Sequence, residues 1–128
     1  MINCVIIDDE PLAREGIGNY VREIDFLNLL GICENPLDLI KLLDQHRVDL
    51  IFLDIQMPKM NGIDATRAIR ALPNYAATPI LAMTANAFDE DRQVCIDAGM
   101  NEHIGKPVVP EKLFETLLKW LSKEKQFH

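Results

Sequence analysis

Acidic side chains follow two apolar segments of this chain, where together they could bind a metal ion. Asp8 and Asp9 follow the apolar segment 2–7, and Asp54 follows the apolar run that begins at Val48. Carboxylates that converge in one cleft repel one another, and Mg²⁺ relieves this repulsion because it prefers oxygen ligands. An aspartate can also act as a nucleophile. The three residues therefore suit a metal-assisted reaction at a carboxylate.

Two further polar residues follow later apolar segments. Thr84 comes directly after segment 79–83 and offers a hydroxyl donor. Lys106 comes soon after segment 100–104 and offers a positive charge, which could pair with Asp54 or with a phosphoryl group. A nucleophile, a metal and charge-stabilising donors are what phosphoryl transfer to a carboxylate requires.

Strand and helix patterns alternate five times along the chain and would position these residues. Strands are expected at 2–7, 26–33, 48–53, 79–83 and 100–104. Helices are expected from Pro11 to Ile24, from Pro36 with Asn35 as its cap, over 63–72, from Asn86 to Gly99, and over a last segment ending near Leu121. The expected inward residues are Leu37, Ile40 and Leu43 in the second helix, and Leu113, Phe114, Leu117, Leu118 and Leu121 in the fifth.

Five strand–helix units of this length predict an α/β fold, a doubly wound (βα)5 domain with a five-stranded parallel sheet and helices on both faces. The common strand order is 2-1-3-4-5, the flavodoxin-like arrangement, in which the strand order reverses between strands one and three. Ligands bind at the carboxyl ends of strands beside such a reversal. The fold therefore predicts that Asp8, Asp9 and Asp54 share one crevice, with Thr84 and Lys106 at its flank.

Composition narrows the class of protein. The 128 residues suit one domain, expected over 1–123 with a polar, frayed tail at 124–128. A net charge of −7 argues against direct nucleic-acid binding. No apolar run approaches the ~18–20 residues of a membrane span, and the first residues lack the basic region of a signal peptide, so a cytoplasmic location is expected. Three separated cysteines are expected to be reduced and buried: Cys4, Cys33 and Cys95.

The same residues resemble a known family. The sequence Asp8-Asp9, the segment Leu-Asp-Ile-Gln-Met-Pro around Asp54, Gly62, Thr84-Ala85 and Lys106-Pro107 are similar to the motifs of the receiver domain of two-component response regulators. The resemblance covers essentially the whole chain. It implies that Asp54 is the phosphoacceptor, that Lys106 and Thr84 contact the phosphoryl group, and that Lys106–Pro107 is a cis peptide. It also implies a Mg²⁺ site formed by Asp9, Asp54, the backbone carbonyl of Gln56 and, through water, Asp8.

The resemblance carries further expectations about activity and partners. The chain would be a signalling switch of a phosphorelay that promotes its own phosphorylation and dephosphorylation, without turnover of an external substrate. Its phosphoryl donor would be a histidine kinase or a histidine phosphotransfer protein. It would be a monomer or a weak dimer through helix four, strand five and helix five, without contact to nucleic acid or membrane.

One position departs from the usual motif. The family commonly has Tyr or Phe where this chain has His103. His103 could move together with Thr84 as a switch pair after phosphorylation, or it could be a half-buried ring at the end of strand five. Both interpretations stay open from the sequence alone.

The two halves of the chain resemble different groups of receivers. The segments up to about Gly62 are similar to receivers of regulators that carry a LytTR-type DNA-binding domain. The segments from about Asp64 are similar to receivers fused to hybrid histidine kinases. One natural protein with both styles would explain this pattern. So would a chimera with a seam near residues 60–65, for example an engineered receiver with no physiological partner.

Two other functions fit the fold but not the motifs. A flavodoxin-like electron carrier that binds FMN needs a phosphate loop rich in Ser, Thr and Gly after the first strand, whereas Asp8-Asp9-Glu10 would repel a phosphate. A phosphatase of the aspartyl-phosphate type usually has a second acid two residues after the nucleophile, where this chain has Gln56.

Overall fold

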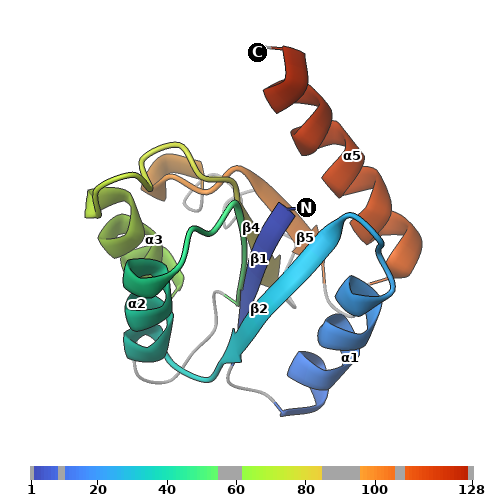
Figure 1. Cartoon of the computed structure of the whole chain (residues 1–128), viewed down its shortest axis with the longest axis horizontal. Helices are drawn as coiled ribbons and strands as arrows, with labels where there is room; N and C mark the ends of the chain where they lie inside the picture. Colours follow the sequence, from blue (N-terminus) through green and yellow to red (C-terminus); the bar gives the residue numbers. More distant parts are fainter. Residues whose placement is uncertain (1, 9–10, 55–61, 85–95, 106–108, 127–128) are drawn as a thin grey trace.

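A parallel sheet forms the centre of the molecule. The computed structural model describes residues 2–8, 11–54, 62–84, 96–105 and 109–126. The five strands lie in the order β2-β1-β3-β4-β5, with helices on both faces of the sheet (Figure 1). The strands are β1 (Ile2–Ile7), β2 (Leu27–Cys33), β3 (Leu50–Asp54), β4 (Ile80–Thr84) and β5 (Glu102–Gly105). The helices are α1 (Pro11–Arg22), α2 (Pro36–Gln45), α3 (Gly62–Ala71) and α5 (Pro110–Gln126). The predicted fold class and strand order are confirmed.

The central strand β3 is covered on both faces. All five of its residues are buried, and alternate side chains enter two separate core clusters. Leu50 and Phe52 pack with residues of α1 and α5, in a cluster that we call the α1/α5 core. Ile51 and Leu53 pack with residues of α2 and α3, in the α2/α3 core. A strand buried on both faces requires the nearly continuous apolar run that the sequence shows.

Helix α2 begins as the sequence predicts, and Leu43 is buried as predicted, but the inner face includes Leu39 rather than Leu37. The Asn35 side chain accepts a hydrogen bond from the backbone N–H of Asp38 at 3.0 Å, and Pro36 occupies the first turn. The prediction that Leu37 points inward is wrong: Leu37 is 72% exposed, whereas Leu39 is 1% exposed. Apolar residues cover a wide arc of this helix, so its periodicity allows two inner faces, and packing against the sheet selects the one that contains Leu39.

Helix α5 buries a narrower stripe than predicted and continues farther. Leu113 and Leu117 are fully buried, but Phe114 and Leu118 are 43% and 46% exposed, contrary to the prediction. Each exposed residue follows a buried one, which places it about 100° around the helix, beyond the contact with the sheet. The helix continues to Gln126 because its last residues, Lys-Glu-Lys-Gln, are good helix formers.

A helical turn precedes β5. Residues 96–98 are helical, and Gly99 follows them with a φ of 115°. A left-handed residue is a common way to end a helix, so Gly99 stops the fourth helix as expected. The start of that helix at Asn86 lies outside the described residues.

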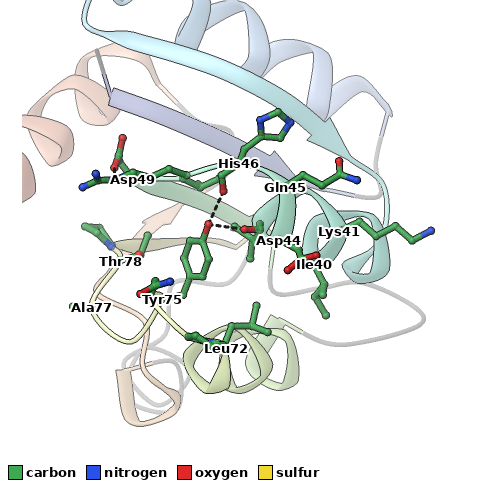
Figure 2. Close-up of a pocket in the computed structure, with 16 residues that line it drawn as sticks. Ile40, Lys41, Asp44, Gln45, His46, Asp49, Leu72, Tyr75, Ala77 and Thr78 are labelled. Carbon is green, nitrogen blue, oxygen red and sulfur yellow. Dashed lines mark hydrogen bonds and ion pairs between the residues drawn. The ribbon is translucent and has the colours of Figure 1, made fainter.

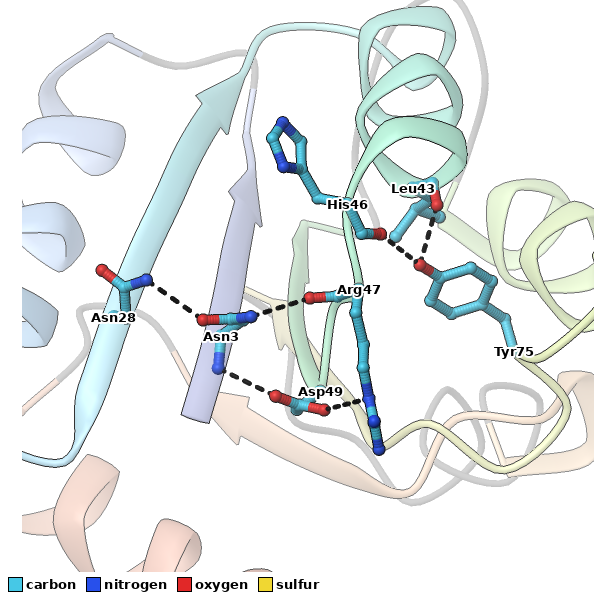
Figure 3. A network of polar contacts seen from close by, with 7 residues as sticks. All are labelled: Asn3, Asn28, Leu43, His46, Arg47, Asp49 and Tyr75. Carbon is cyan, nitrogen blue, oxygen red and sulfur yellow. Dashed lines mark hydrogen bonds and ion pairs between the residues drawn. The ribbon is translucent and has the colours of Figure 1, made fainter. Parts of the chain in front are cut away.

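The amino-terminal edge of the sheet is fixed by polar contacts (Figure 3). The Asp49 carboxylate accepts a hydrogen bond from the backbone N–H of Asn3 at 3.0 Å, and Arg47 Nε lies 3.5 Å from the same carboxylate. The Asn3 side chain donates to the Arg47 carbonyl and accepts from Asn28, each at 3.0 Å. These contacts join the start of β1 to β2 and to the segment before β3. They therefore help to set the register of the three strands.

Two of the three cysteines are buried free thiols, as predicted. Burial raises the pKa of Cys4 to about 12. The pKa of Cys33 is raised to about 11, mainly by burial and to a smaller extent by the negative charge of Asp38. Cys95 lies outside the described residues. No helix in the part of the chain that the structure describes is long and apolar enough to span a bilayer.

The exposed Leu37 and the buried Leu39 of α2 allow a matched test of the core. Leu39→Ala should lower the free energy of unfolding by about 2–4 kcal/mol, because it leaves a cavity in the α2/α3 core. Leu37→Ala should change it by less than about 0.5 kcal/mol, because the side chain is already in water. Urea unfolding of both variants measures the difference. Equal losses would show that the inner face of α2 has been assigned incorrectly.

Candidate functional site

The pairing of β1 with β3 brings two carboxylates together at the carboxyl edge of the sheet. The last paired residues are Ile7 in β1 and Leu53 in β3, and Asp8 and Asp54 are the next residue of each strand. Because the two strands are parallel, these next residues occupy adjoining positions. Asp8 is 0% exposed and Asp54 is 2% exposed. The structure therefore places Asp8 and Asp54, the two predicted site residues whose side chains it describes, in one buried location.

Neighbouring strands hold both backbones in place. The backbone N–H of Asp8 donates to the carbonyl of Cys33, the last residue of β2, at 3.1 Å. Asp54 pairs with Met83 in β4. Asp8 thus follows a strand that is flanked by β2, and Asp54 ends a strand that is flanked by β4. The reversal of strand order lies between them, as expected for a ligand site in a doubly wound sheet.

The strands β4 and β5 end at the same edge. Their last paired residues are Thr84 and Gly105, so the chain reaches Lys106 directly after β5. The backbones of Thr84 and His103 lie in β4 and β5, as predicted, and their side chains are not described. Four predicted site residues lie outside the described residues altogether: Asp9, Gln56, Lys106 and Pro107. The cis peptide and the full set of metal ligands therefore stay predictions.

Two nearly inaccessible carboxylates thus lie at adjoining positions. Removing an ionised carboxylate from water is unfavourable unless it gains hydrogen bonds or an opposite charge. Both Asp8 and Asp54 take part in polar or electrostatic interactions within the protein. Their oxygens are hard donors of the kind that Mg²⁺ accepts. The arrangement can therefore hold a small divalent cation beside a carboxylate nucleophile.

An open hollow lies at the opposite edge of the sheet (Figure 2). It is lined by the end of α2, the segment before β3 and the segment between α3 and β4. Within it the Tyr75 hydroxyl shares its proton between the carbonyl oxygens of Leu43 and His46, each 2.8 Å away. None of the predicted site residues lines this hollow, and it faces the amino ends of the strands. We therefore place the candidate site at the carboxyl edge.

Two well-bonded side chains were not singled out from the sequence. Arg70 at the end of α3 and Glu102 at the start of β5 each join separate elements of the fold. Their partners lie 5 to 31 residues away along the chain. Local sequence patterns contain no signal for contacts of that range.

Comparisons with known proteins agree with the fold. The family model described as "Response regulator receiver domain" matches residues 4–118. The chain is 34% identical over 122 residues to hybrid signal transduction histidine kinase E of Dictyostelium discoideum, covering 92% of this chain and 7% of that protein. It is 33% identical over 114 residues to the signal transduction histidine-protein kinase BarA of Escherichia coli K12, covering 89% of this chain and 12% of that protein. The chain thus spans only a small part of these relatives.

Solved structures give the same result. The chemotaxis protein CheY4 of Vibrio cholerae superposes with a TM-score of 0.86 at 25% identity, covering 93% of this chain and 98% of that one. The receiver domain of the sensor histidine kinase PA1611 from Pseudomonas aeruginosa superposes with a TM-score of 0.84 at 30% identity, covering 94% and 98%. That structure is described as having a magnesium ion coordinated in its active site cleft. From the matched family model, these relatives and the shared fold, we conclude that the chain belongs to the response regulator receiver domain family.

Proposed function

We propose that this chain is the phosphoacceptor of a two-component phosphorelay and that Asp54 receives the phosphoryl group. Receiver domains of hybrid histidine kinases and response regulators act as phosphoacceptors in two-component signalling, and this chain belongs to that family. The observation that carries the assignment to Asp54 is its position. It is a buried carboxylate at the end of the central strand, beside Asp8 and at the reversal of strand order.

The chemistry is a transfer between two side chains. An Asp54 carboxylate oxygen attacks the phosphorus of a phosphohistidine on the partner, so an O–P bond forms and the N–P bond breaks. The electron pair of the broken bond stays on the imidazole nitrogen, which takes up a proton. Lys106 binds the phosphoryl oxygens, and the Thr84 hydroxyl donates to them after transfer.

A magnesium ion fits the described donors at this site. Asp8 and Asp54 are buried carboxylates, and their oxygens match the preference of Mg²⁺. When bound, the ion would neutralise the negative charge that accumulates between the carboxylate and the phosphoryl group. In this proposal Asp9, Asp54 and the Gln56 carbonyl are direct ligands, and Asp8 acts through a water molecule.

The partners and the setting belong to the same proposal. The phosphoryl donor is a histidine kinase or a histidine phosphotransfer protein, because a phosphohistidine is the donor that matches the carboxylate acceptor. The chain acts in the cytoplasm as a monomer or a weak dimer, and it catalyses only its own phosphorylation and dephosphorylation. A net charge of −7 supports the absence of direct nucleic-acid contacts.

An FMN-binding carrier is disfavoured by the position of Asp8. Its carboxylate is buried directly after β1, where the flavodoxin-like carrier would need a loop that accepts a phosphate. A phosphate there would lie beside two buried carboxylates, which repel it.

We favour a single natural origin over a composite chain. The alignment with the Dictyostelium kinase covers 92% of the chain and therefore extends across residues 60–65. In the α1/α5 core, Ile17 and Val21 from α1 and Leu113 and Leu117 from α5 are each at most 3% exposed. Residues from both sides of the suggested seam thus bury one another well, which supports cores that evolved together.

Phosphorylation should depend on Asp54. Incubation with acetyl phosphate and Mg²⁺ should raise the intact mass of the parent chain by one phosphoryl group, and Asp54→Asn should abolish this gain because the amide is a poor nucleophile. Asp49→Asn, the same change just before β3, should still be phosphorylated. Stoichiometric uptake by Asp54→Asn would exclude Asp54 as the acceptor.

Loss of Asp9 should weaken magnesium binding more than loss of Asp8. Asp8→Ala should reduce the affinity by about ten- to hundredfold, as is typical for a group that acts through a bound water, and Asp9→Ala by a larger factor. Asp25→Ala, at an exposed position, serves as the control. Isothermal titration with Mg²⁺ measures the three dissociation constants. The ranking is refuted if the Asp8 and Asp9 variants bind equally.

The Thr84 hydroxyl should be needed for the response rather than for the transfer. Thr84→Ala should accept the phosphoryl group but show smaller amide chemical-shift changes over residues 86–110, because the donor that senses the phosphate is missing. Thr84→Ser, which keeps the hydroxyl, should restore these changes. A full response in Thr84→Ala would leave no role for Thr84 in the switch.

A further inference from the structure

The register of β5 against β4 decides where the chain enters the segment that carries Lys106. β5 has four residues and lies at the edge of the described sheet, next to β4 (Figure 1). Lys106 directly follows its last residue. A strand rises about 3.3 Å per residue, and its side chains alternate between the two faces of the sheet. A slip of one residue would therefore shift the end of β5 by about 3.3 Å and reverse its faces.

Apolar packing gives β5 little help in finding its register. Among the described residues of this strand, Ile104 is the one that belongs to a core cluster. Glu102 at the start of the strand bonds to Lys119 and Trp120, which attaches β5 to α5 but does not fix it against β4. The register of a short strand with few buried side chains is weakly specified, so a contact next to the strand can decide it.

Asn101, directly before β5, bonds twice to the first residue of β4. Its backbone N–H donates to the Ile80 carbonyl at 2.9 Å. Its side-chain Oδ1 accepts from the Ile80 backbone N–H, also at 2.9 Å. The regular pairing of the two strands follows, from Leu81 with Glu102 onward. Two bonds to one backbone unit favour a single register, because a slip of the strand would break both.

Arg70 in α3 fixes the amide of Asn101. Its Nη2 donates to Asn101 Oδ1 at 2.8 Å, so this oxygen accepts two bonds, one for each lone pair. Nε and Nη2 also donate to the Gly99 carbonyl at 3.0 and 2.7 Å. Nη1 donates to the carbonyls of Tyr75 and Thr78 at 3.0 and 2.6 Å. The arginine therefore holds the segments before β4 and β5 together.

The guanidinium of Arg70 is closely enclosed by these segments. Its five bonds equal its number of N–H groups. A Cβ added to Gly99 would lie 3.1 Å from Arg70 Cγ and 3.2 Å from Nε, and the φ of 115° there also favours glycine. Burial lowers the pKa of Arg70 from its usual value. Breaking bonds in such a partly buried place is costly, so the contact holds its geometry firmly.

Contacts at the same edge also fix β4 against the central strand. The backbone N–H of Ile51 in β3 donates to the carbonyl of Pro79, directly before β4, at 3.0 Å. From there β3 runs to Asp54 and β4 to Thr84. Thr84 lies four positions after Ile80, which is about 13 Å along an extended strand. The amino-terminal edge thus sets which residues adjoin at the carboxyl-terminal edge.

We propose that Asn101 and Arg70 are positioning residues for the phosphoryl transfer: they fix the register of β5 against β4 and so place Lys106 beside the phosphoryl group on Asp54. The proposal rests on the function proposed above. Asn101 acts through Lys106, from the opposite edge of the sheet.

The initial rate of phosphorylation tests this role on the full chain, by intact mass after mixing with acetyl phosphate and Mg²⁺. Asn101→Leu keeps the size of the side chain but removes the acceptor. It should slow phosphorylation by about tenfold or more, because a misplacement of about 1 Å can cost up to about a hundredfold in rate. Its Mg²⁺ dissociation constant should stay within about twofold of the parent value, because sites more than about 10 Å apart act nearly independently.

Three further variants serve as controls. Asn101→Asp keeps the oxygen that accepts both bonds and should retain most of the parent rate. Arg70→Lys keeps the charge but not the planar fork, so it should slow phosphorylation as Asn101→Leu does and leave Mg²⁺ binding intact. Asn19→Leu, the same change at an exposed position of α1, should not alter the rate.

A double-mutant cycle separates positioning from general packing. Lys106→Met removes the ammonium group that Asn101 is proposed to place, and it should itself slow phosphorylation. In this background Asn101→Leu should have little further effect on the rate, because no lysine is left to misplace.

Each outcome decides the matter. A normal rate in Asn101→Leu would overturn the positioning role. An equal slowing with and without Lys106 would do the same, as would a loss of Mg²⁺ affinity as large as the loss of rate, since the damage would then be general. In these cases the parent still gains one phosphoryl group and the proposed function stands. Failure of the parent to gain it would overturn the proposed function and, with it, the positioning role.

Discussion

The parallel pairing of β1 with β3 is the constraint on which the rest of the structure depends. This pairing buries Asp8 and Asp54 at adjoining positions, although two carboxylates without access to water repel each other. Two full core clusters, one on each face of the sheet, secure the strands that carry both residues. Apolar packing thus fixes the position of the acidic pair.

The two edges of the sheet have different tasks. At the amino-terminal edge, polar side chains join separate segments. Asn3 and Asp49 join β1 to the segment before β3. Arg70 joins α3 to the segments before β4 and β5. At the carboxyl-terminal edge the strands end in residues that can carry out chemistry. Because the contacts that set the strand register lie at the amino-terminal edge, the loops at the carboxyl-terminal edge can vary without loss of register.

The sequence predicts the fold because its local signals and its long-range pairing agree. The apolar run through β3, the Asn35-Pro36 start of α2 and the acidic residues after β1 and β3 each have one simple interpretation, and the rule on strand order then brings the carboxylates together. The sequence does not predict which of Leu37 and Leu39 is buried, since the apolar arc of α2 permits both. Nor does it reveal Arg70, which donates mostly to backbone carbonyls that every residue possesses, or Glu102, whose side-chain partners Lys119 and Trp120 lie 17 and 18 residues away.

The buried thiols have a consequence for the chemical stability of the molecule. With pKa values of about 12 and 11, Cys4 and Cys33 are thiolates at neutral pH in on the order of one molecule in ten thousand or fewer. The thiolate is the form that reacts with peroxide, disulfides and alkylating agents, so both sulfurs are almost inert while the domain is folded. Cys33 also contributes the carbonyl that holds the backbone of Asp8, and oxidation of its sulfur would introduce a bulky polar group beside that contact. Burial of Cys33 therefore also protects the backbone contact that holds Asp8 against oxidants.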